Sequence, residues 1–74
     1  MEKEVISLLV EEKRKATAQN IQNECLLEAS KSLTISADMA KQIANQQDQL
    51  ARQIELNKSY IKILGEKIDQ LSKE

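Results

Sequence analysis

The sequence predicts an all-α protein: a long amphipathic helix, or a helical hairpin kinked near residues 30–36, in a coiled coil or helical bundle. Three observations support this fold class. The chain of 74 residues contains no Pro and a single Gly, so little in it breaks a helix. Ala, Leu, Ile, Gln, Glu and Lys, which are mostly good helix formers, are abundant. An apolar seven-residue repeat extends over the second half of the chain.

The composition also indicates where the apolar surface must be buried. Aromatic residues make up 1% of the chain, so large side chains that could anchor a globular core are almost absent. A chain this short has a marginal core when it folds alone. The helices are therefore expected to pack on other amphipathic helices, from copies of the same chain or from partners, as a homo- or hetero-oligomer.

The N-terminal segment, residues 1–21, is predicted to be a weakly amphipathic helix. Glu2 and Glu4 lie where the helix dipole favours negative charge. The apolar residues Val5, Leu8 and Leu9 are followed by a mostly polar stretch. This segment is expected to order on binding, as a second contact site.

The weakest helical stretch is "SKSLTIS", residues 30–36, which combines three Ser with β-branched residues. Ser36 or Thr34 could cap a new helix there, with Asp38 in its first turn. A hairpin that turns here is one interpretation. Because no Gly, Pro or Asn-Gly marks a sharp turn, the sequence favours an uninterrupted or gently kinked helix.

The second segment, residues 22–74, is predicted to be a heptad coiled coil. One register fits residues 22–71 without a stutter, and most of its a and d positions are apolar. The predicted helix-interface residues are Leu26, Leu33, Ala40, Ile43, Leu50, Ile54, Ile61, Leu64, Ile68 and Leu71.

The two halves of this seam favour different assemblies. From Ile54 onward, Ile occupies a and Leu occupies most d positions, which favours parallel two-stranded packing. The middle carries small residues such as Ala29, Ser36 and Ala40, which suit a bundle of more than two helices. A four-helix arrangement satisfies the middle better.

A polar core layer is predicted from Gln46, Gln47 and Asn57. A buried amide without a partner costs about 1 to 3 kcal/mol. When such amides pair across a seam, they fix its register. Gln47 is long enough to reach water instead, whereas Asn57 is shorter and is the better candidate for a register lock.

The stretch "DMAKQIANQQDQLARQI" resembles a SNARE motif of the glutamine-contributing class. The similarity lies in the spacing of Met39, Ile43, Gln46 and Leu50 within residues 22–74. The resemblance implies a parallel four-helix bundle with partner helices, a central glutamine at Gln46, and a role in membrane fusion. In the continuous heptad Gln47 takes the inward position instead, so the two glutamines belong to competing phases.

Catalytic chemistry is not expected. Without His and with one Cys, the chain has no zinc site of the usual ligand type and no Cys–His nucleophile pair. The single Gly excludes a Gly-rich phosphate loop, and no cofactor is expected. The basic run Lys13, Arg14, Lys15 adjoins Glu11 and Glu12 and lacks neighbouring aromatics, so nucleic-acid binding is not expected either.

The sequence therefore predicts a non-catalytic coiled-coil module for protein–protein interaction or oligomerisation, with the SNARE-like helix as the alternative. No apolar run reaches the length of a transmembrane helix. The lone Cys25 weakly favours a reducing compartment, and the expected location is cytoplasmic.

Overall fold

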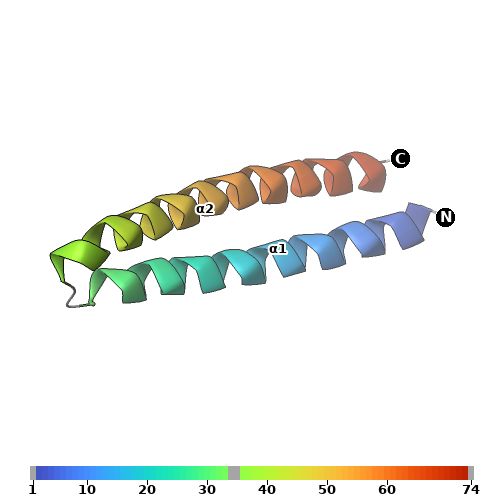
Figure 1. Ribbon diagram of the computed structural model, residues 1–74. Helices are drawn as coiled ribbons and strands as arrows, with labels where there is room; N and C mark the ends of the chain where they lie inside the picture. The colour runs from blue at the N-terminus through green and yellow to red at the C-terminus, as the bar shows by residue number, and fades with distance from the viewer. Residues whose placement is uncertain (1, 34–35, 74) are drawn as a thin grey trace.

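The computed structural model shows two antiparallel α-helices joined as a hairpin (Figure 1). It describes residues 2–33 and 36–73. Helix α1 (Glu2–Lys31) and helix α2 (Ala37–Ser72) lie side by side, and the two chain ends meet at the same end of the molecule (Figure 1). The hairpin measures 57 × 14 × 14 Å. The all-α prediction is confirmed.

The preference for an uninterrupted helix is wrong, and the alternative, a hairpin, is what the chain forms. Serine hydroxyls explain why α1 ends without Gly or Pro. The hydroxyl of Ser30 donates to the carbonyl of Leu27 at 2.6 Å, and that of Ser32 donates to the carbonyl of Ala29 at 2.8 Å. Such side-chain bonds compete with the helical backbone ladder and weaken it.

Ser36 is the N-cap residue of α2, with extended backbone angles of φ −71° and ψ 158°. Its carbonyl accepts hydrogen bonds from the amides of Met39 and Ala40, each at 3.1 Å. Its side chain makes no capping bond, so the start of α2 depends on backbone geometry and on Asp38 in the first turn. Thr34, the other predicted cap, lies outside the described residues.

The two helices meet along one seam. The α2 residues that are buried or half-buried against α1 follow heptad spacing: Ile43, Gln47, Leu50, Ile54, Asn57, Ile61, Leu64, Ile68 and Leu71. The corresponding residues of α1 are Ile6, Leu9, Ala16, Asn20, Asn23, Leu27 and Ser30. Within the described residues, Ile54 and Leu64 are the only buried apolar side chains, at 6% and 5% exposure.

Two hydrogen bonds and one close approach between the helices mark the register of the hairpin. The amide of Gln47 donates to the hydroxyl of Ser30 at 3.1 Å near the turn. The hydroxyl of Tyr60 donates to the carboxylate of Glu12 at 3.1 Å. Nearer the chain ends, a Cβ at Gly65 would lie 3.6 Å from the Nζ of Lys13. Asn57 lies ten residues after Gln47 on α2, and Asn20 lies ten residues before Ser30 on α1. Because the helices are antiparallel, the two asparagines lie at the same level along the seam.

Ile54→Ala should lower the free energy of unfolding by about 2 to 4 kcal/mol, because it leaves a cavity in a seam with few buried apolar groups. Ile21→Ala is the matched control, since Ile21 is 58% exposed and Ile54 is 6% exposed. The control should change the free energy by less than about 1 kcal/mol. Urea denaturation followed by circular dichroism measures both values. Equal losses in the two variants would contradict the observed seam.

Candidate functional site

The predicted helix-interface residues divide into two groups. Seven of them lie on the α2 face that packs against α1: Ile43, Leu50, Ile54, Ile61, Leu64, Ile68 and Leu71. The other three, Leu26, Leu33 and Ala40, are exposed. The single register does not continue into α1, because the chain reverses and α1 turns Leu27 and Ser30 toward α2 instead.

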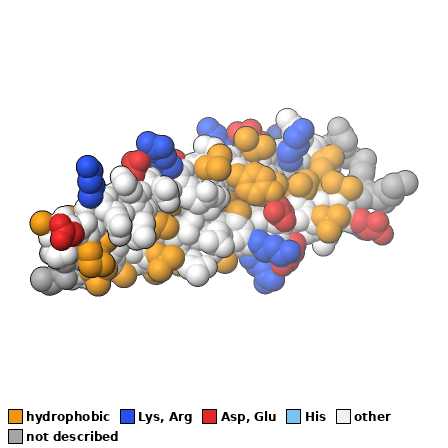
Figure 2. Space-filling view, in the orientation of Figure 1, with side chains coloured by type: hydrophobic (Ala, Val, Ile, Leu, Met, Phe, Trp, Pro, Cys, Tyr) orange, Lys and Arg blue, Asp and Glu red, His pale blue; other side chains and the backbone are white. Residues whose placement is uncertain are grey.

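The exposed apolar residues gather on one side of the hairpin, which we call the open face. The open face consists of two rows of residues, one on each helix, in which successive members are three or four positions apart. The α1 row runs through Glu12 and Leu26, and the α2 row runs through Gln46 and Tyr60. Of the residues that the structure describes, ten large hydrophobic ones are exposed, and eight of these belong to the two rows: Val5, Leu8, Leu26, Leu33, Met39, Leu56, Tyr60 and Ile63. Figure 2 shows hydrophobic side chains along the length of the molecule on the side in view.

Charge is depleted on the open face. Among the described residues, its only charged ones are Glu12, Lys15 and Lys67. The opposite side of the hairpin, the back face, holds Val10 and Ile21 and eleven charged residues: Lys3, Arg14, Glu24, Glu28, Lys31, Lys41, Asp48, Glu55, Lys58, Lys62 and Asp69. Depletion of charge together with exposed apolar groups is typical of the centre of an interface.

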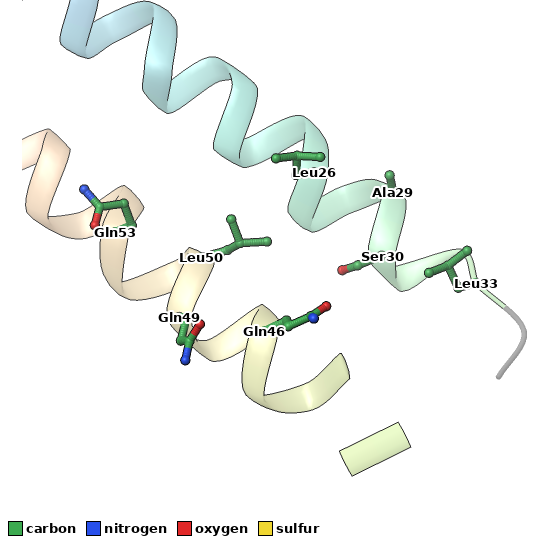
Figure 3. A pocket seen from close by; sticks show the side chains of 8 residues that line it. All are labelled: Leu26, Ala29, Ser30, Leu33, Gln46, Gln49, Leu50 and Gln53. Carbon is green, nitrogen blue, oxygen red and sulfur yellow. The ribbon is translucent and has the colours of Figure 1, made fainter. Parts of the chain in front are cut away.

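The open face is hollowed near the turn (Figure 3). The hollow has a volume of about 630 Å³. It is lined by Leu26, Ala29, Ser30 and Leu33 of α1 and by Gln46, Gln49, Leu50 and Gln53 of α2. Leu50 and Gln46 reach into the space between the helices, whereas Gln49 points away from it (Figure 3). Apolar side chains thus form the wall on α1, and glutamines form the rim on α2.

Gln46 and Gln47 take different positions in the hairpin. Gln47 is half-buried in the seam, where its amide pairs with Ser30 across the two helices. It therefore does not reach out to water, as one interpretation of the sequence expected. Gln46 is exposed and lines the hollow.

Asn57 belongs to a buried layer of three asparagines at the middle of the seam. Asn20, Asn23 and Asn57 are 6%, 5% and 8% exposed. The Oδ1 atoms of Asn23 and Asn57 accept hydrogen bonds from Gln19 and Gln53 of their own helices. Asn20 Oδ1, Asn23 Nδ2 and Asn57 Nδ2 have no hydrogen-bond partner in the described part of the chain. The layer thus carries both acceptors and donors that its own helices do not satisfy.

Tyr60 lies on the open face with its hydroxyl on Glu12. Desolvation of the phenol is the largest cause that raises its pKa above the ordinary value of 10, and the Glu12 carboxylate raises it further. The carboxylate accepts a hydrogen bond from the neutral phenol and repels the phenolate, so both effects favour the protonated form.

The described side chains bring no three Asp, Glu or Cys residues together as a metal-binding cluster. Cys25 is an exposed free thiol. Neither described helix has a segment long and apolar enough to cross a membrane. What the arrangement offers is an elongated apolar surface that can pack against helices.

Comparison with protein-family models, curated proteins and solved structures finds no match to this chain.

Sequence reasoning missed the contribution of α1 to the site. Asn20 and Asn23 were not expected in the core, and Val5 and Leu8 were not expected on the same face as Leu26. The signal was available in principle, since Ile6, Leu9, Ala16 and Leu27 share a heptad phase with the two asparagines. The boundary drawn between residues 21 and 22 falls inside α1.

Asn57→Leu should raise the free energy of unfolding by about 1 to 2 kcal/mol, because it removes a buried donor that has no partner and adds apolar surface to the seam. Asn45→Leu, at an exposed position of the same helix, controls for the difference in helix propensity. Thermal and urea unfolding measure both variants. A loss of stability in Asn57→Leu beyond that of the control would contradict this account of the asparagine layer.

Glu12→Gln should lower the pKa of Tyr60 toward its ordinary value, because it removes the negative charge beside the phenol. A raised pKa in the folded state means that this stabilisation is present below pH 10 and is lost as the pH rises through the folded-state pKa. The wild type should therefore lose more stability than the variant in that alkaline range.

Tyr60 is the only tyrosine and the chain has no Trp, so ultraviolet absorbance of the phenolate reports its titration directly. Glu11→Gln is the control, because Glu11 pairs with Arg14 at 3.0 Å and not with Tyr60. A titration midpoint that shifts equally in the two variants would refute the Glu12 contact.

Proposed function

We propose that this protein is a non-catalytic helix-association module, which packs its open face against further helices of its own kind or of a partner. The observation that carries the proposal is the position of eight of the ten exposed large hydrophobic residues on that one face. An isolated pair of helices leaves these side chains in water. Packing a second pair of helices over them would produce a four-helix bundle, the arrangement in which such hairpins bury apolar surface.

The distribution of charge supports the same proposal. The ion pairs Arg14–Glu11, Arg52–Asp48 and Lys58–Glu55 all lie outside the open face. Covering the open face would therefore desolvate few charges, whereas covering the back face would desolvate many. Since burial of an unpaired charge is costly, the open face is the favoured surface for association.

A SNARE-like helix is the alternative proposal. Its segment, residues 22–74, contains the break between α1 and α2, so this role requires the hairpin to open and the helices to realign with three foreign helices. The observation that favours it is the exposure of Gln46 beside the apolar hollow. A chain that is monomeric and largely unfolded in isolation, by light scattering and circular dichroism, would support this alternative over the hairpin module.

Replacing Leu56 and Ile63 together by Gln should abolish association, because it removes apolar groups from the middle of the open face. The matched variant replaces Val10 and Ile21 of the back face by Gln. Light scattering over a wide concentration range should give a mass above 8.4 kDa for the wild type and the back-face variant, and 8.4 kDa for the open-face variant. The same mass for all three proteins would contradict the proposal.

A further inference from the structure

The open face has two unlike halves. The half near the turn contains the hollow of about 630 Å³ between Leu26, Leu33 and the glutamines of α2. The half near the chain ends carries Leu8, which is 70% exposed and is the most exposed of the large hydrophobic residues. Leu8 and Ala29, one of the residues that line the hollow, are 21 residues apart on α1, or about 32 Å along its axis. A projecting leucine and a recess for it therefore lie at opposite ends of one face.

We propose that a second copy of this chain covers the open face, related to the first by a two-fold axis that crosses the hairpin perpendicular to its long direction. The rotation exchanges the two halves, so that Leu8 of each copy enters the hollow of the other. Two equivalent insertions hold the pair, as in any isologous dimer. The inference rests on the proposed function and names its partner and geometry.

The position of the axis is set by the two features that it must exchange. The midpoint between Leu8 and Ala29 falls at residues 18 and 19, close to the middle of α1 (Glu2–Lys31). The two hairpins then overlap along nearly their whole length. A face of 57 by 14 Å covers about 800 Å², which is the area that each partner buries in an interface of standard size.

Charge and packing favour this axis over one along the helices. The three charged residues of the open face all lie in the half near the chain ends, so the perpendicular axis sets them against the uncharged half of the second copy. Lys15 and Lys67 come level with Gln22 and Gln49 of that copy, whose amide oxygens can accept their hydrogen bonds. Glu12 still accepts the hydrogen bond from the hydroxyl of Tyr60 in its own copy.

An axis along the helices would instead set hollow against hollow. Glu12 could then pair with Lys67 of the second copy, but an exposed ion pair contributes little. The unfilled space would forfeit the dispersion contacts of every residue that lines it. Leu8 of the second copy would occupy part of each hollow and regain some of those contacts, which favours the perpendicular axis.

Disulfide cross-linking of the full chain tests the axis. In a Cys25→Ser background, Gln19→Cys places one thiol of each copy beside the axis, and Ala18→Cys places it on the outer side of the same helix turn. Mild oxidation should convert Gln19→Cys to a covalent dimer at least about tenfold faster than Ala18→Cys. Equal rates would overturn the perpendicular axis.

A mixture of two single-cysteine proteins tests the other axis. The two proteins are Gln22→Cys and Gln53→Cys. Position 22 of one copy lies opposite position 53 of the other only when the axis runs along the helices. A mixed dimer that forms faster than the Gln19→Cys dimer would overturn the inference. The proposed function would still stand in that case, provided that replacing Leu56 and Ile63 by Gln abolishes association. A wild-type chain that does not associate at all would overturn both the proposed function and this dimer geometry.

Leu8→Ala tests the insertion itself. Because each dimer loses two buried leucines, the dissociation constant measured by light scattering should rise about a hundredfold or more. Ile21→Ala, on the back face, should leave it unchanged. Circular dichroism at low concentration checks that both variants remain helical. A dissociation constant for Leu8→Ala equal to that of the wild type would overturn the insertion of Leu8 into the hollow.

Discussion

The seam between α1 and α2 joins a largely apolar stripe to one that is partly polar, and this mismatch determines the rest of the structure. Helix α2 contributes Ile and Leu at most of its inward positions, whereas α1 contributes Ala16, Asn20, Asn23 and Ser30 along with its apolar residues. As a result, only two apolar side chains in the described part of the chain are buried. A pair of helices with so small a core is marginal on its own. A hairpin of this kind would gain stability by packing on further helices, which is the basis for proposing the open face as an association surface.

The same mismatch gives the seam a defined register. Asn20 and Asn57 lie level with each other, and Ser30 pairs with Gln47 near the turn. Sliding α2 by one heptad would bring Asn57 level with Leu27 in one direction and with Lys13 in the other. Asn57 would then no longer lie level with Asn20, and the bond between Gln47 and Ser30 would break. Polar groups that weaken the native seam thus weaken its competitors more. The turn adds a second constraint, because only five residues lie between the end of α1 at Lys31 and the start of α2 at Ala37.

The sequence was most informative for α2 and least informative for α1. Ile and Leu recur at one spacing from Ile43 to Leu71, so the packed face of α2 could be derived without a structure. In α1 the apolar residues from Val5 to Val10 are nearly consecutive, and they satisfy several helical phases equally well. The sequence also favoured an uninterrupted helix over a turn, because the end of α1 relies on serine hydroxyls and not on Gly or Pro. Since the open face exists only once both helices are in phase, neither helix alone could reveal it.

The glutamines of α2 acquire a physical role in this arrangement. Gln46, Gln49 and Gln53 line the hollow between apolar residues, at positions where Lys or Glu would be equally compatible with a helix. An amide is well solvated when the face is open, and it can donate and accept hydrogen bonds when the face is covered. A charged side chain at these positions would lose far more solvation energy on burial. A face that combines leucines with glutamines can therefore be exposed in a single hairpin and buried in an assembly, which is the property that a reversible helix-association surface requires.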